Sequence, residues 1–102
     1  MNGLTNFQVE VARLFFDLPS SDGFLLAGGG ALLATGLTTR PTQDLDFFGS
    51  PGASDIDAAH EEFTVAAAHR KWTVDVVQRS STFIRLRVIG AELLVVDLAI
   101  DA

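Results

Sequence analysis

The stretch "TQDLDFFGS" (residues 42–50) alternates acidic and apolar side chains, which is the pattern of a β-strand with one buried face. In a strand, this alternation places Asp44 and Asp46 on one face and the apolar residues that follow each of them on the other. Two carboxylates on a shared face, roughly 6–7 Å apart along the strand, repel one another and lose hydration. A divalent cation removes this cost because Mg²⁺ prefers hard oxygen ligands. The stretch therefore predicts a metal-binding strand, with two solvated acids at a strand end as the alternative.

A glycine-rich turn precedes this strand, in "FLLAGGGALLATG" (residues 24–36). A short apolar strand that runs through glycines into a helix offers backbone N–H groups and the positive end of the helix dipole to an anion. The stretch has no lysine for a Walker A loop, and Leu33 stands where a dinucleotide fingerprint needs its third glycine. We therefore predict phosphate binding at Gly28, Gly29 and Gly30. A tight turn that simply requires glycine is the alternative.

A third acid lies in "LLVVDLAID" (residues 93–101), where Asp97 follows four apolar residues. A charge in an interior strand is rarely tolerated without a partner. If this strand neighbours the strand of Asp44 and Asp46, three carboxylates converge. Such a group can hold two metal ions about 3.5–4 Å apart, the arrangement used in phosphoryl and nucleotidyl transfer. The alternatives are an aspartate at a strand end that faces water, or one that caps a downstream element absent from these residues.

Hydrophobic periodicity predicts the order α-β-α-β-α-β-β-β along the chain. This order indicates an α+β (α/β-like) domain in which helices flank a mixed five-stranded sheet. With 102 residues, the chain is long enough for one such domain and too short for two. The predicted strands are residues 24–27, 44–49, 72–78, 82–89 and 92–99, and the predicted helices are residues 5–18, the segment from the glycine turn to Gly36, and a segment from Ser54 or Asp55 to about His69.

Composition restricts the possible functions. Hydrophobic residues make up 48% of the chain and there are eight phenylalanines, which indicates a globular protein. Without cysteine, disulfides and thiolate metal sites are excluded. A net charge of −6 argues against a broad nucleic-acid surface, although a local contact to a nucleotide or an RNA end is compatible with it. The chain has no apolar run of membrane-spanning length and no signal peptide, so we expect a cytoplasmic protein with no membrane partner.

Two arginines, Arg85 and Arg87, alternate with apolar residues and share one face of a predicted strand. They either face a nucleotide or an RNA end, or they pair with acids on the open face of the sheet.

Two blocks of the chain resemble a known family. The stretches "FLLAGGGALL" (residues 24–33) and "TRPTQDLDFF" (residues 39–48) are similar to the AbiEii/AbiGii toxin family of bacterial abortive-infection and type IV toxin–antitoxin systems. More broadly, a Gly-Gly turn followed by Asp-x-Asp and by a third Asp on a later strand resembles the nucleotidyltransferase superfamily, which includes the DNA polymerase β-like enzymes. The similarity is close over residues 24–48 and loose over residues 92–101. It implies a nucleotidyltransferase fold for residues 1–102, taken as a single domain.

The resemblance assigns roles to the residues around the glycine turn. Gly28 and Gly29 match the glycine pair that approaches the triphosphate in the family. Gly30 stands where the family usually has Thr or Ser, so one hydroxyl group is missing. Arg40 and Thr42 match the basic and hydroxyl positions that contact phosphate.

The resemblance also implies a reaction. Asp44, Asp46 and Asp97 match the three catalytic, metal-binding acids, with Mg²⁺, or Mn²⁺ in its place, as cofactor and a nucleoside triphosphate (NTP) as substrate. The implied enzyme transfers a nucleoside monophosphate to an RNA (tRNA) or protein acceptor, with an antitoxin protein as a further partner. A non-catalytic nucleotide-binding or assembly domain and a protein-adenylylating antitoxin are the alternatives. The family's helical C-terminal half is not among these residues, so we expect the chain alone to transfer nucleotide poorly.

Overall fold

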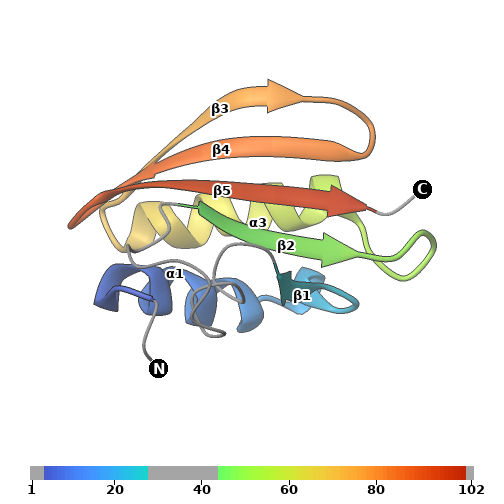
Figure 1. The fold of residues 1–102 in the computed structure, drawn as a ribbon, viewed down its shortest axis with the longest axis horizontal. Coiled ribbons are helices and arrows are strands. Elements are labelled where there is room, and N and C mark those ends of the chain that lie inside the picture. The colour runs from blue at the N-terminus through green and yellow to red at the C-terminus, as the bar shows by residue number, and fades with distance from the viewer. Residues whose placement is uncertain (1–3, 28–43, 101–102) are drawn as a thin grey trace, which may run out of the picture.

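A five-stranded sheet with two α-helices on one face makes up residues 4–27 and 44–100, the part of the chain that the computed structural model describes (Figure 1). The strand order is β1-β2-β5-β4-β3. Strands β2 and β5 are parallel, and the other neighbours are antiparallel. The elements are α1 (Asn6–Phe16), the 3₁₀ helix η1 (Pro19–Ser21), β1 (Leu25–Ala27), β2 (Asp44–Gly49), α3 (Ile56–His69), β3 (Thr73–Arg79), β4 (Phe83–Ile89) and β5 (Leu93–Ile100).

The predicted fold class is confirmed: the sheet is mixed and has five strands, and helices cover one of its faces. The helix predicted after the glycine turn lies outside the described residues. The first helix ends at Phe16, two residues earlier than predicted, because Pro19 disfavours the helical conformation of the residue before it and begins a 3₁₀ turn instead. Within residues 4–27 and 44–100, no helix is long and apolar enough to cross a membrane.

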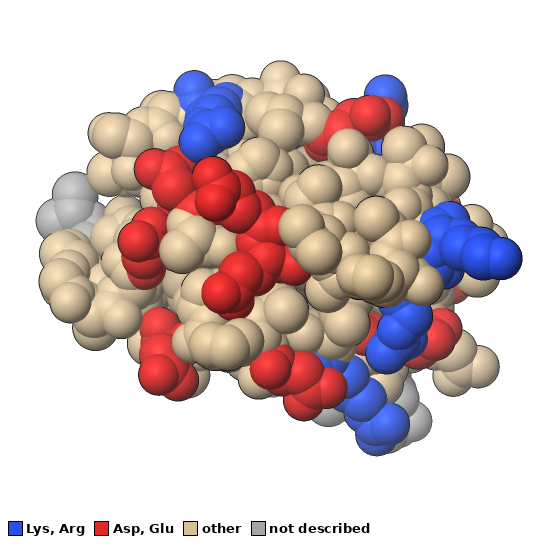
Figure 2. Space-filling view, turned by 180° about the vertical axis from the view of Figure 1, so that it is seen from behind, with Lys and Arg blue, Asp and Glu red and all other residues tan. Residues whose placement is uncertain are grey.

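The helical side of the molecule is acidic. Figure 2 views the molecule from behind and shows a cluster of acidic side chains on that surface. Helix α3 and the residue that caps it contain four acids: Asp55, Asp57, Glu61 and Glu62. A nucleic-acid backbone would be repelled from this side.

Helix α1 is defined by its cap and by one apolar stripe. The Thr5 hydroxyl accepts a hydrogen bond from the Gln8 backbone N–H (3.1 Å), and the Gln8 side chain accepts one from the Thr5 N–H (2.7 Å). This reciprocal capping box satisfies two amide groups that a helix start otherwise leaves unpaired. Phe7, Val11 and Phe15 follow at helical spacing and are buried against the sheet.

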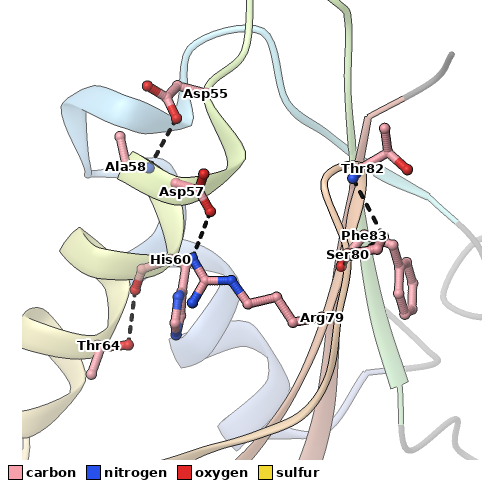
Figure 3. Close-up of polar contacts among 9 residues, drawn as sticks. All are labelled: Asp55, Asp57, Ala58, His60, Thr64, Arg79, Ser80, Thr82 and Phe83. Atoms are coloured by element: carbon pink, nitrogen blue, oxygen red, sulfur yellow. Dashed lines mark hydrogen bonds and ion pairs between the residues drawn. The ribbon is translucent and has the colours of Figure 1, made fainter.

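Helix α3 begins at the predicted cap. The Asp55 carboxylate accepts a hydrogen bond from the Ala58 N–H (3.0 Å), and Phe63 on the buried face of the helix enters the core. Figure 3 shows a second link, in which Arg79 at the end of β3 reaches across to Asp57 (2.8 Å). The helix is thus tied to the edge strand of the sheet as well as packed beneath its centre.

The aromatic core decides which way β2 faces. Phe15 of α1 stacks on Phe47 of β2, with ring centroids 4.1 Å apart, and Leu45 is buried beside them. A shift of the strand by one residue would move both apolar side chains into solvent and bury the acids. The core therefore fixes Asp44 and Asp46 on the face of the sheet opposite to the helices.

Candidate active site

The open face of the sheet brings two of the predicted acids together at its centre. Asp46 of β2 pairs with Asp97 of β5 in parallel register. Residues in register on neighbouring strands point to the same face of a sheet. The expectation that the strand of Asp97 neighbours the strand of Asp44 and Asp46 is therefore confirmed. Both acids lie on the face opposite to α1 and α3.

An arginine holds the buried member of this pair. Arg85 of β4 lies opposite Asp97 in the antiparallel register. Its Nε donates to Asp97 Oδ1 (2.9 Å) and its Nη2 donates to Oδ2 (3.0 Å). The Asp97 side chain is 10% exposed and lies inside β5, so the alternative of a water-facing aspartate at a strand end is wrong. Charge-assisted, bidentate bonds of this kind are among the strongest hydrogen bonds in proteins.

The two arginines of β4 both pair with acids on the open face. Arg87 contacts Asp75 of β3 through a single bond of 3.3 Å between two largely exposed side chains. Arg85, by contrast, contacts both Asp97 and Phe83, because its guanidinium carbon also lies 5.5 Å from the centre of the Phe83 ring. Of the two predicted roles for the arginines, pairing with acids is the one present in this structure.

The carboxyl group of Asp46 has a raised pKa in this site. Partial burial raises the pKa of its carboxyl group above the ordinary value of 3.8, and the adjacent Asp97 carboxylate raises it further. Asp44 adds a smaller effect of the same sign, and Arg85 partly opposes all three. The ionised form of Asp46 is thus disfavoured where it stands, and a cation placed beside it would stabilise that form.

The donor set fits a divalent cation in chemistry, because adjacent carboxylates supply the hard oxygen ligands that Mg²⁺ prefers. Asp46 and Asp97 lie side by side, and Asp44 is exposed two residues along the same face of β2. Among residues 4–27 and 44–100, however, no three acidic or histidine side chains lie close enough to form a ready metal site. The three-acid metal site stays a prediction.

The predicted phosphate-binding residues Gly28, Gly29, Gly30, Arg40 and Thr42 lie outside the described residues. The described chain on either side of them is close to the acid pair. Strand β1 ends at Ala27, which pairs with Asp46, and β2 begins at Asp44.

Arg85 was not predicted as part of this site, although the sequence contains a signal for it. The β4–β5 hairpin turns at Gly90, and Ile89 pairs with Leu93 at its start. Counting four residues outward along both strands leads to Arg85 opposite Asp97. An opposite-charge pair in register across a hairpin is a recognisable stabilising unit of a sheet.

Comparison with known proteins gave a match to a family model and matches among solved structures. A sequence model of the family described as "Nucleotidyl transferase AbiEii toxin, Type IV TA system" matches residues 11–98. Among solved structures, terminal uridylyl transferase 4 from Trypanosoma brucei with bound UPU is similar at 18% sequence identity and a TM-score of 0.49, over 90% of this chain and 34% of that one. The chain thus spans about a third of the length of that protein. Comparison with curated protein sequences gave no significant match.

Proposed function

The chain belongs to the nucleotidyl transferase AbiEii toxin family of type IV toxin–antitoxin systems, and from this membership we propose that it transfers a nucleoside monophosphate from an NTP to an RNA or protein acceptor. In the proposed reaction, an acceptor hydroxyl oxygen forms a bond to the α-phosphorus. The bond from that phosphorus to the bridging oxygen breaks, pyrophosphate leaves, and the hydroxyl proton passes to water. Of the RNA acceptors, tRNA is the one we would test first.

The observation that carries this proposal is the pairing of Asp46 with Asp97 at the centre of the open face. These two carboxylates would hold a divalent cation, and Asp44 would join them from the same face of β2. A divalent cation bound there would supply charge neutralisation for the triphosphate and for the attacking oxygen. The carboxylates would contact the phosphates through that cation, and neither described helix packs on this face of the sheet.

The distribution of charge over the two sides of the sheet indicates on which side an acceptor would bind. The helical side is acidic (Figure 2) and the whole chain has a net charge of −6, so electrostatic attraction to RNA is weak. The open face carries two arginines, Arg85 and Arg87, beside its acids. We propose that the acceptor approaches over this face through local contacts, with an antitoxin or another partner protein supplying further affinity.

One observation favours a second function. Arg85 occupies both oxygens of Asp97, as an internal counter-ion would in a domain that has lost catalysis. The glycine at position 30, where the family usually has Thr or Ser, points the same way. A non-catalytic nucleotide-binding or assembly domain is therefore the competing proposal.

The replacement Asp46→Asn tests the proposed function. The change keeps the side-chain volume and removes one ligand charge, so we expect Mg²⁺-dependent binding of NTPs to weaken by about tenfold or more, measured by isothermal titration calorimetry with each of the four NTPs. Asp75→Asn is the matched control, because Asp75 lies on the same face but pairs with Arg87. Unchanged metal dependence in the Asp46 variant would refute the assignment. A wild-type chain without metal-dependent nucleotide binding would favour the non-catalytic domain.

A further inference from the structure

Arg85 binds the carboxylate oxygens of Asp97, one of the predicted metal ligands. It is the one basic side chain among the described residues that contacts Asp97, and it uses both carboxylate oxygens. The acid it holds is next to Asp46 on the neighbouring strand. One guanidinium group therefore binds one of two adjacent carboxylates.

The Arg85–Asp97 contact differs from the other arginine–aspartate pair on the same face of the sheet. Arg87, two residues along the same strand and on the same face, makes one longer bond to Asp75 between side chains that are 48% and 46% exposed. Arg85 makes two short bonds to a side chain that is 10% exposed, and Phe83 supports its guanidinium group from the side. A bidentate pair that is held this firmly fixes the orientation of the carboxylate as well as its charge.

We propose, on the basis of the function proposed above, that Arg85 is a positioning residue that holds Asp97 in the metal-free protein and competes with the divalent cation for its oxygens. The guanidinium group neutralises Asp97 while no metal is bound, and it opposes the cost at Asp46 only in part. A cation that enters alone must displace it and leave it without a partner. A cation that enters together with a nucleotide brings phosphates that the released guanidinium can bind. Arg85 thereby makes metal binding depend on nucleotide.

Metal affinity without nucleotide or acceptor tests this competition directly. We would titrate the full chain with Mn²⁺ alone, at constant pH and ionic strength, and measure free Mn²⁺ by electron paramagnetic resonance. In Arg85→Gln, a positive charge next to the ligands is gone, so we expect Mn²⁺ to bind roughly tenfold more tightly than to the wild type. The gain is limited to about this size because the Arg85 side chain is 41% exposed and solvent screens its charge.

Three further variants make the result interpretable. Arg87→Gln removes the same charge from the same strand and face, and we expect its Mn²⁺ affinity to stay within about twofold of the wild type. Arg85→Lys keeps the charge but loses the bidentate geometry, so its affinity should be intermediate, and it guards against loss of folding in Arg85→Gln. In the double variant Arg85→Gln/Asp97→Asn, the gain should disappear. Circular dichroism establishes that each variant is folded.

The outcomes separate this inference from the function on which it rests. Equal or weaker Mn²⁺ binding in folded Arg85→Gln and Arg85→Lys overturns the competition and makes Arg85 a purely structural partner of Asp97. Absence of Mn²⁺ binding from the wild type and from every variant overturns the proposed metal-dependent function, and the inference with it. Tighter binding in Arg85→Gln that persists in the double variant also refutes the role of Asp97.

Discussion

At the scale of single residues, Asp46 links the stability of the protein to its chemistry. Its folded-state pKa is raised, chiefly by burial and then by Asp97, so the fold favours the protonated form. The stability that this provides is present below the unfolded pKa of about 3.8 and is lost as the pH rises through the raised folded value. At neutral pH without metal, the protein therefore carries an unrelieved electrostatic cost at this position.

Asp46→Asn should remove this cost. In buffer with a chelator at pH 7, we expect the variant to be more stable than the wild type by about 0.5–1 kcal/mol, a modest gain because solvent screens a side chain that is only partly buried. At pH 4 the difference should be smaller, since the raised pKa of Asp46 means that more of the wild-type carboxyl group is protonated there than at pH 7. Urea unfolding at the two pH values measures both quantities. A difference of the same size at pH 4 and pH 7 would show that the gain has another origin.

At the scale of elements, the start of α3 depends on one side chain. Asp55 caps the helix through the Ala58 N–H and places a negative charge at the positive end of the helix dipole. We expect Asp55→Ala to lower the free energy of unfolding by about 1 kcal/mol and Asp55→Asn, which can still cap, to lower it much less. Urea unfolding at pH 7 measures both. An equal loss in the two variants would rule out the hydrogen bond as the cause.

The exposed ion pair of the same helix is the useful comparison. Asp57 and Arg79 are 63% and 49% exposed, and pairs of this kind contribute little. Asp57→Asn should therefore cost at most about 0.5 kcal/mol. A larger cost would mean that the link between α3 and β3 matters more than its exposure indicates.

The elements themselves were largely predictable, because their signals are local. Apolar alternation predicted the bounds of β2, and Asp55, one of the two predicted caps, precedes α3. The end of α1 was misplaced by two residues, where Pro19 imposes a 3₁₀ turn, and the bounds of β1, β3, β4 and β5 differ from the prediction by one residue. The parallel pairing of β2 with β5 could be stated only as a condition, because no turn joins the two strands and nothing local records their register.

The candidate site was predictable in part for the same reason. The sequence indicated that Asp97, a charged residue within an apolar strand, needs a partner. In the structure Asp97 is buried and paired with Arg85. Its partner Arg85 was not predicted, although the register can be counted from the hairpin turn, because two roles had been left open for Arg85. The residues predicted to bind phosphate, Gly28 to Gly30 with Arg40 and Thr42, lie outside the described structure, so their roles remain predictions.

At the scale of the whole molecule, net charge determines the affinity of the protein for RNA and the salt dependence of that affinity. With seven basic residues in the chain and a net charge of −6, few phosphates can be neutralised on binding. We expect a weak affinity for tRNA, with a slope of log K against log[salt] no steeper than about −2, as for two or three local phosphate contacts. Fluorescence anisotropy between 50 and 200 mM salt measures this slope. A much steeper dependence would reveal a basic surface that the composition does not lead us to expect.

The position of β5 at the centre of the sheet has a consequence for how the chain folds. Both of its neighbours, β2 and β4, precede it in the sequence, so the middle of the sheet is the part that is made last. Until β5 inserts, β2 and β4 each have an unpaired edge, and the latter carries Ile84, Leu86 and Val88. Such edges promote aggregation, and pairing between strands distant in sequence is slow. Mutations that delay insertion of β5 should therefore first lower the yield of soluble protein, and the Asp46–Asp97 pair cannot exist in a chain that is still incomplete.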